Sequence, residues 1–243
     1  MPSTVLGEFL GTLVLILLGN GVVAGTLLEG TKSNGAGWIA ITAGWGFAVL
    51  AGVLVAVGLD APGELNPAVT LANVLFGTRT APDALWHVGA QMLGAITGAT
   101  LVWLHYLSHW GLTRDPAAVL ACFCTAPAIR KTVPNLISEI LGTMVLVIVA
   151  SAIGTRAVAG TTPATNLGPA LVGALVWGIG LSLGGPTGYA INPARDLGPR
   201  IAHALLPISG KGGNDWGYAW IPVVGPLVGG VLASMIWQAS TGT

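Results

Sequence analysis

Long apolar segments separated by short polar connections dominate the pattern of hydrophobic and polar positions along this chain. A bilayer core of about 30 Å requires about 20 consecutive apolar residues in a helix. Six segments meet that requirement approximately, at residues 5–28, 38–59, 84–110, 133–153, 167–183 and 218–237. The pattern therefore predicts six membrane-spanning helices, joined by connections that are too short to form a soluble domain.

Two further helix-like stretches are too short to cross a bilayer. Residues 69–76 would extend about 12 Å as a helix, at about 1.5 Å per residue. Residues 193–206 are also short, and they contain Arg195, Asp196 and Arg200, which are rare in an ordinary span. Irregular backbone at membrane depth is tolerated where it is buried in protein or lines a watery cavity. We therefore expect two re-entrant half-helices beside a pore or a binding cavity.

The two halves of the chain repeat one another. Glu8 opens the first span within Gly-Glu-Phe-Leu-Gly-Thr, and Glu139 opens the fourth within Ser-Glu-Ile-Leu-Gly-Thr. An Asn-Pro-Ala triplet begins each half-helix, and the six residues are Asn66, Pro67, Ala68, Asn192, Pro193 and Ala194. Because each half holds three spans, the second half is inverted, so the half-helices enter from opposite faces and their beginnings meet near the midplane. We predict a single domain over residues 1–243, with repeat halves at about 1–110 and 133–243 linked by loop 111–132.

The repeated Asn-Pro pairs have two possible roles. Asn is a good helix N-cap and Pro is favoured at the first helical position, so one Asn-Pro is usually only a helix start signal. Two pairs in symmetric places, each before a fragment too short to cross, favour a second role. An Asn that caps its own helix through oxygen keeps two NH₂ donors for a pore, and each helix start adds about half a positive charge. Such a midpoint passes water or a hydroxyl group and opposes sodium ions and protons.

Composition and charge indicate a membrane protein. Hydrophobic residues make up 53% of the chain and charged residues 7%, with a mean hydropathy of +0.79, whereas soluble domains carry about 25% charged residues. The 9 basic and 9 acidic side chains cancel, which excludes a basic surface for nucleic acid. The 37 glycines lie within the apolar segments and indicate helices that pack closely on small residues. We expect a multi-pass integral protein of the cell membrane, in contact with the lipid bilayer.

These features resemble the major intrinsic proteins, the family of aquaporins and glycerol facilitators. The resemblance rests on the two Asn-Pro-Ala triplets, the paired Glu-x-x-Gly-Thr openings and the segment pattern, and it covers nearly the whole chain. It implies an all-α membrane protein with six transmembrane helices, two re-entrant half-helices and an inverted three-span repeat, the aquaporin-like fold, assembled as a homotetramer. It also implies a selectivity filter made by Arg195 and Tyr189 together with Trp45 and Gly180, which match the remaining corners by spacing.

Within this resemblance, the filter residues favour the glycerol-conducting subgroup. Two aromatic rings, Trp45 and Tyr189, beside the guanidinium donors of Arg195 suit a polyol whose carbons slide along the rings. Gly180 predicts a wide opening, whereas water-selective members resemble one another in carrying a His at this corner. Four further positions match residues that glycerol-conducting members carry, namely Asp196, Arg200, Pro226 and Leu227. The alternative role for Asp196 is that of a first-turn acid complementing the helix dipole.

Two other positions leave alternatives open. Trp45 lies about 10 Å deeper than Trp38, too deep for an interfacial anchor, so the alternative to a filter role is core packing. Glu64 stands where the family commonly has a pore-side His. Its carboxylate either adds a titratable group near one mouth or turns away and holds loop backbone, and the cost of a charge in a narrow pore favours the second alternative.

The paired glutamates also allow two interpretations. An acid within a span is by default a functional site, often a proton relay. The matching positions of Glu8 and Glu139 favour a structural role instead. Each would accept hydrogen bonds from the loop before one half-helix, because loop N–H groups at membrane depth need acceptors.

Other chemistry has little support in the sequence. His105, His109, Cys122 and Cys124 could supply zinc ligands, but the pairs flank a span end and lack the usual cysteine spacing. The sequence contains no Ser-His-Asp set, phosphate-binding loop or ATP motif. We therefore expect no metal, no cofactor and no enzymatic activity.

The predicted function is passive conduction. Glycerol, other small neutral solutes and water would pass down their gradients, while ions and protons are excluded. One alternative is a water-selective aquaporin. The other is a carrier or channel for small organic acids such as lactic acid, in which Glu8, Glu64 or Glu139 would titrate.

Overall fold

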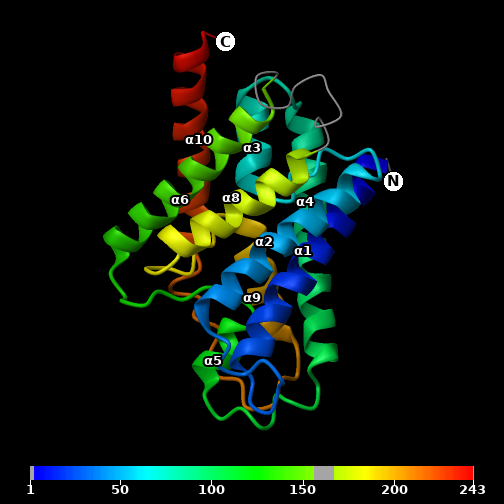
Figure 1. The fold of residues 1–243 in the computed structure, drawn as a ribbon, viewed down its shortest axis with the longest axis vertical. Helices are drawn as coiled ribbons and strands as arrows, with labels where there is room; N and C mark the ends of the chain where they lie inside the picture. The colour runs from blue at the N-terminus through cyan, green and yellow to red at the C-terminus, as the bar shows by residue number, and fades with distance from the viewer. Residues whose placement is uncertain (1–2, 156–166, 243) are drawn as a thin grey trace.

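The computed structural model describes residues 3–155 and 167–242, and Figure 1 shows them as a bundle of helices. No strand occurs within those residues. In chain order the helices are α1 (Ser3–Leu27), α2 (Gly37–Val57), α3 (Pro67–Leu75), α4 (Ala81–His105), α5 (Pro116–Ala121), α6 (Thr132–Ile153), α8 (Gly168–Leu183), α9 (Pro193–Leu205) and α10 (Ile221–Thr241). The predicted single domain, 1–243, also includes residues 156–166, which lie outside the described part of the chain.

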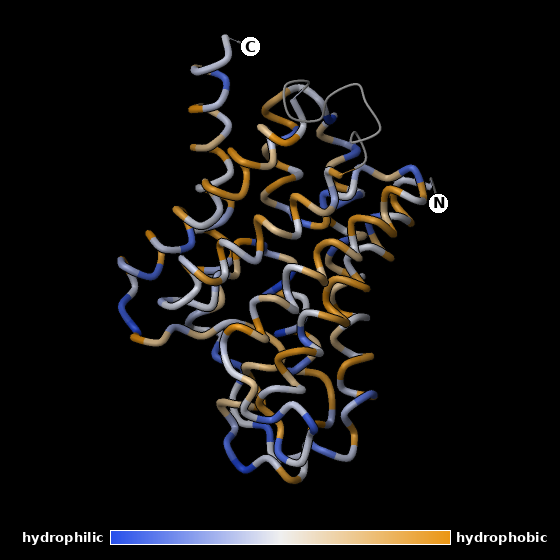
Figure 2. The backbone as a smooth tube through the Cα atoms, viewed as in Figure 1, coloured by the Kyte–Doolittle hydropathy of each residue, from blue (hydrophilic) through white to orange (hydrophobic). Residues whose placement is uncertain are grey.

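Six long helices occupy the six predicted spans. By length and composition, α1, α2, α6 and α10 can each cross a membrane. The helix α4 has 25 residues, and the 16 residues of α8 extend about 24 Å. Figure 2 shows apolar colours along the long helices and hydrophilic colours gathered in the connections. Large apolar side chains such as Ile39, Phe47 and Leu85 are exposed, as lipid contact requires.

The third span ends earlier than its apolar pattern predicts. The predicted span reaches residue 110, but α4 ends at His105 and is followed by turns. The reason is the side chain of Trp110, which folds back into the core and is 1% exposed. Its Nε1 donates to the carbonyl oxygen of Trp103 at 2.9 Å, and its ring lies 5.6 Å from that of Phe123. This burial cannot be distinguished from a membrane-interface position by hydropathy alone.

Both predicted half-helices are present, and the connecting loop holds one further helix. The helices α3 and α9 begin at Pro67 and Pro193, so α3 starts two residues before the predicted stretch. The additional helix, α5, follows a local signal of the same kind. Asp115 accepts a hydrogen bond from the N–H of Ala117 at 2.9 Å, and Pro116 occupies the first position.

Close helix packing on glycine occurs at matching places in the two halves. A Cβ atom at Gly94 of α4 would overlap the carbonyl oxygen of Phe9 in α1. A Cβ at Gly229 of α10 would lie 2.5 Å from the carbonyl oxygen of Ile140 in α6. Because α1 corresponds to α6 and α4 to α10 in the repeat, the same backbone approach is made once in each half. Small residues permit such approaches between membrane helices.

We predict that Gly94→Val destabilises the protein, because the added side chain separates α4 from α1. Overpacking of this kind typically costs about 1–3 kcal/mol. The measurement is the midpoint of thermal unfolding of the purified protein in detergent. The matched control is Gly89→Val on the same helix, where a Cβ meets no atom within 4 Å. Equal losses for both variants would contradict the close approach.

Candidate functional site

The two half-helices begin beside one another, and an asparagine caps each of them. Asn66 and Asn192 are both extended at φ −156°. The Oδ1 atom of Asn66 accepts from the N–H of Ala68 at 2.9 Å, and that of Asn192 accepts from the N–H of Ala194 at 2.9 Å. The local start signal that the sequence indicates is therefore present at both places.

The same asparagines also join the two halves of the chain. The Nδ2 group of Asn66 donates to the carbonyl oxygen of Ile191, and that of Asn192 donates to the carbonyl oxygen of Leu65, both at 2.8 Å. The expectation that both amide hydrogens face a pore is therefore wrong for one of the two. Each NH₂ carries two hydrogens, and one holds the opposite loop while the other has no partner among the described residues. Both asparagines line a cavity, so the second hydrogen is available to its contents.

A buried glutamate supports the loop before each half-helix. The two carboxylate oxygens of Glu8 accept from the N–H groups of Glu64 and Leu65, both at 2.8 Å. Those of Glu139 accept from Ala190 at 3.0 Å and Ile191 at 2.8 Å. Leu65 and Ile191 have φ values of 50° and 45°, and this backbone form turns successive N–H groups toward the carboxylate.

Two aromatic side chains and one guanidinium lie together in the wall of the cavity. The Cζ atom of Arg195 lies 4.1 Å from the ring centroid of Trp45, within the range of a cation–π contact. Within the described residues the guanidinium of Arg195 donates no hydrogen bond to protein, so its donors remain available. Tyr189 completes the wall, and all three side chains line the cavity.

The absence of a side chain at Gly180 leaves space that the ring of Tyr189 fills. A Cβ at Gly180 would lie 2.7 Å from Cζ and 2.8 Å from the hydroxyl oxygen of Tyr189. Trp38 reinforces this contact, because its Nε1 donates to the carbonyl oxygen of Gly180 at 3.1 Å and its ring meets Tyr189 edge-on. The expectation of an open corner at Gly180 is therefore wrong. Gly180 positions Tyr189, and it is not among the residues that line the cavity.

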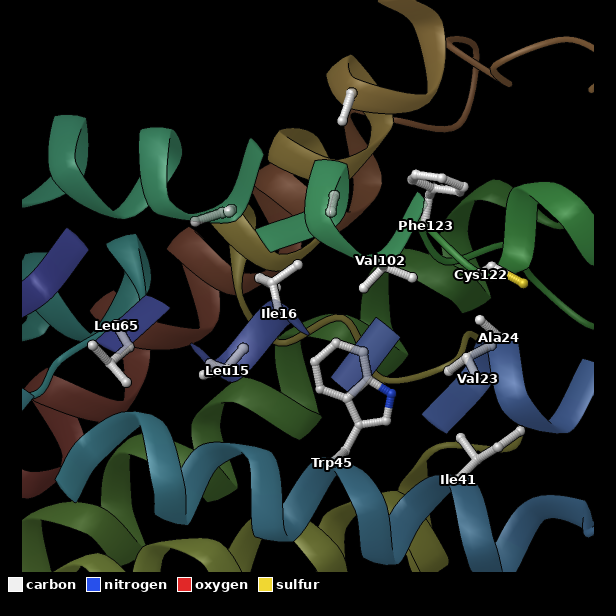
Figure 3. Close-up of a cluster of buried hydrophobic side chains, with 14 of the residues drawn as sticks. Leu15, Ile16, Val23, Ala24, Ile41, Trp45, Leu65, Val102, Cys122 and Phe123 are labelled. Atoms are coloured by element: carbon white, nitrogen blue, oxygen red, sulfur yellow. The ribbon is translucent and has the colours of Figure 1, made fainter. Parts of the chain in front are cut away.

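Trp45 projects from α2 toward α1, as the close-up of the buried cluster shows (Figure 3). Its ring rests on Gly19 of α1, where a Cβ would overlap it. Although the side chain is 3% exposed, its Nε1 has no hydrogen-bond partner within the described residues. The ring therefore packs in the core and also lines the cavity, and the filter role expected for it stays a prediction.

The cavity is lined by both polar and apolar residues. Its volume is 190 Å³, and its apolar wall includes Leu15, Val49, Val53, Leu146, Val172 and Val176. It adjoins a vestibule of 510 Å³, which Arg195 does not line. Pro62, Gly63, Glu64, Val69 and Ala150 line both volumes. A small polyol or water can therefore meet both hydrogen-bond donors and hydrocarbon in this cavity.

The favoured expectation for Glu64, that it turns away and holds loop backbone, is wrong, because Glu64 lines both cavities and binds side chains. Its carboxylate accepts from the hydroxyl of Thr70 and the amide of Asn73, both at 2.7 Å, and pairs with Arg79 at 3.2 Å. It therefore binds side chains of α3 and the following loop rather than loop backbone. The sequence lacks a direct signal for this pairing, because Arg79 is brought to Glu64 by the turn after α3.

Asp196 and Arg200 hold two loops against α9. Asp196 accepts from the N–H of Thr125 at 2.7 Å and from its hydroxyl at 2.6 Å, and it pairs with Arg200 at 2.8 Å. Arg200 donates in turn to the carbonyl oxygens of Asn214 and Asp215, at 2.8 and 3.0 Å. Both charged side chains are fully buried. Neither side chain is among the residues that line the cavity.

The remaining predicted positions lie away from the cavity. Pro226 is buried within α10 and Leu227 is partly buried beside it, and no contact in the structure explains why these two residue types occur there. His105, His109, Cys122 and Cys124 do not gather into a metal-ligand group within the described residues. Burial raises the pKa of both thiols, which keeps them protonated and makes them weak ligands.

Comparisons with known proteins agree with this geometry. The family model described as Major intrinsic protein matches residues 2–237. The chain is 52% identical to a probable glycerol uptake facilitator protein of Thermotoga maritima, over 97% of this chain and 98% of the relative. It is 53% identical to a glycerol uptake facilitator protein of Streptococcus pneumoniae, over 98% of this chain and 99% of the relative. The aquaglyceroporin structure from Plasmodium falciparum is similar with a TM-score of 0.84 at 29% identity, covering 97% of this chain and 95% of that one.

We predict that Asp196→Asn destabilises the protein strongly, because it leaves Arg200 buried without its ion-pair partner. Breaking a buried pair typically costs about 3–5 kcal/mol. The matched control is Asp83→Asn, which removes the exposed acid in the first turn of α4. A first-turn acid that acts on the helix dipole alone contributes about 0.3–1 kcal/mol. The measurement is the midpoint of thermal unfolding of each variant. Equal shifts for the two variants would show that Asp196 acts only as a first-turn acid.

Proposed function

Because the chain belongs to the major intrinsic protein family, we propose that it is a membrane channel through which glycerol and other small neutral solutes diffuse passively. Its fold is the aquaporin fold, an all-helical membrane architecture. Water is expected to follow the same route. We expect no enzymatic activity, since the cavity contains hydrogen-bonding groups but no paired nucleophile and base among the described residues.

One observation carries the proposal of a polyol substrate. The guanidinium of Arg195, which donates to no protein group among the described residues, lines the same cavity as the rings of Trp45 and Tyr189. A polyol has hydroxyls on one side that accept from the guanidinium and carbon atoms on the other that contact the rings. The guanidinium donors replace part of the hydration that the hydroxyls lose, and the rings provide apolar contact for the carbon atoms.

The asparagine pair supports exclusion of ions and protons. Each of Asn66 and Asn192 keeps one amide hydrogen for the cavity, and two helix beginnings direct partial positive charge to the same point. A water that accepts from both amides directs its own hydrogens away from one another along the passage. This orientation interrupts a hydrogen-bonded proton path, and the field opposes any cation.

We further propose that Glu8 and Glu139 maintain this arrangement without titrating during transport. Both oxygens of each carboxylate accept backbone hydrogen bonds, which uses the ionised form as a structural acceptor. This use of the acids favours passive conduction over a proton-coupled carrier. The filter corner occupied by Tyr189 and the apolar cavity wall favour a polyol channel over a strict water channel.

The function is tested by stopped-flow light scattering of proteoliposomes made with the purified full-length chain. We expect glycerol and water fluxes well above those of empty vesicles, with no change in glycerol flux when a pH gradient is imposed. Lactic acid uptake is measured in the same vesicles. Water flux without glycerol flux would support the water-selective alternative, and uptake that requires a pH gradient would support the acid carrier.

A second prediction concerns the corner at Gly180. Gly180→Ala should push the Tyr189 ring into the cavity and lower glycerol flux more than water flux, since glycerol is wider. A rise of about 1.4 kcal/mol in the barrier, within the usual range for overpacking, lowers glycerol flux about tenfold. The control is Gly178→Ala on the same helix, where a Cβ meets no atom within 4 Å. An unchanged glycerol-to-water ratio in Gly180→Ala would contradict this role.

We also propose a homotetramer of single-domain subunits, as the family resemblance implies. Exposed apolar residues on α2 and α8, including Phe47, Leu54, Trp177 and Leu181, provide surface for helix contacts between subunits. Native mass spectrometry of the detergent-extracted protein distinguishes a tetramer from a monomer. A monomer that retains full glycerol flux would contradict the assembly and leave the channel function intact.

A further inference from the structure

A buried group of three potential metal ligands lies beside the loop that precedes α3. It consists of Glu8 from α1, Glu64 from the loop before α3 and His87 from α4. One ligand atom from each residue lies within 4.8 Å of the other two. The cavity walls and the loop support already described do not involve His87. No metal site is predicted from the sequence, because the three residues are far apart along the chain.

His87 is the unexplained member of this group. Its side chain is 2% exposed, and within the described residues its Nδ1 atom has no hydrogen-bond partner. That nitrogen lies 3.5 Å from Oε2 of Glu64. Gln91, one turn further along α4, also carries a buried oxygen without a partner, while its Nε2 donates to Glu8 at 2.8 Å. Buried polar atoms are rarely left unsatisfied, so two on one helix face indicate a missing ligand.

The local charge favours a cation. Glu8 and Glu64 bring two carboxylates into the protein interior, and among the described residues Arg79 pairs with Glu64 but not with Glu8. The carboxylate of Glu8 has no cationic partner within those residues and is held by hydrogen bonds from Glu64, Leu65 and Gln91. Burying an unpaired charge is costly, and a bound cation would remove that cost.

We propose that Glu8, Glu64 and His87 form a binding site for a divalent transition metal ion of the zinc type. One imidazole nitrogen and two carboxylate oxygens are ligands that zinc accepts, whereas magnesium prefers oxygen ligands and water. Zinc–ligand bonds of about 2.0–2.1 Å set neighbouring ligands about 3.4 Å apart in a tetrahedron. The 3.5 Å between His87 and Glu64 fits this spacing. Glu8 reaches it by a small shift, and water or the free oxygen of Gln91 completes the coordination.

The position of Glu64 relates the site to the vestibule. Glu64 lines both the 190 Å³ cavity and the 510 Å³ vestibule, so this ligand of the site is in contact with the vestibule, which neither capping asparagine lines. Binding draws the carboxylate toward His87 and away from Thr70 and Arg79. Metal binding would therefore change the position of a side chain that lines the vestibule. This inference does not depend on which solute the cavity conducts.

The test is metal binding by the purified full-length protein in detergent. Isothermal titration with Zn²⁺ is expected to show one site per chain, and Mg²⁺ is expected not to compete. Co²⁺ added in place of zinc should give the visible absorption of a tetrahedral nitrogen and oxygen site. A thiolate charge-transfer band would instead place the ion on Cys122 or Cys124 and overturn the proposal.

Two substitutions make the test specific. His87→Leu removes the nitrogen ligand at similar volume and should lower zinc affinity at least about tenfold. The matched control, His105→Leu, removes an exposed histidine at the other end of α4 and should leave zinc affinity unchanged. Circular dichroism verifies that each variant is folded, and Glu64→Gln provides a second ligand variant if His87→Leu does not fold. Absence of zinc binding, or equal affinity in wild type and a folded ligand variant, would overturn the site.

Discussion

A reciprocal pair of amide-to-carbonyl hydrogen bonds holds the centre of this protein together. Asn66 reaches across to the loop before α9, and Asn192 reaches across to the loop before α3. Both loops are irregular backbone within a membrane protein, where an unsatisfied polar group costs several kcal/mol. The pair therefore satisfies each loop with the cap of the opposite half-helix, so neither half can complete its own loop without the other.

The rest of the conduction route follows from how the two loops are supported. Glu8 and Glu139 take the N–H groups on one side of each loop, leaving carbonyl oxygens on the other side. Glycine approaches such as Gly94 on Phe9 bring the long helices close enough for those acids to reach the loops. The cavity lining consequently includes these loop residues and the two asparagines together with aliphatic side chains. This combination suits small solutes with both hydroxyls and carbon.

Much of this arrangement could be predicted because it repeats. The spans, the half-helices and the capping roles of Asn66 and Asn192 follow from segment length and from residues whose chemistry acts locally. Positions that depend on a distant partner could not be predicted in the same way. Trp110 continues an apolar run, yet it turns back on Trp103, and hydropathy does not distinguish burial in protein from burial in lipid. Gly180 suggests an open corner, yet a phenol ring from another segment occupies it.

The sequence by itself determined the membrane environment, the inverted repeat and the two helix starts, because hydrophobic length and N-cap chemistry are properties of short segments. Only the tertiary structure decided how each amide divides its two hydrogens, that Glu64 pairs with Arg79, and that His87 approaches the same carboxylate. These outcomes depend on the positions of groups far apart along the chain. A side chain's hydrogen-bonding capacity can be read from its residue type, but its partner is determined by packing.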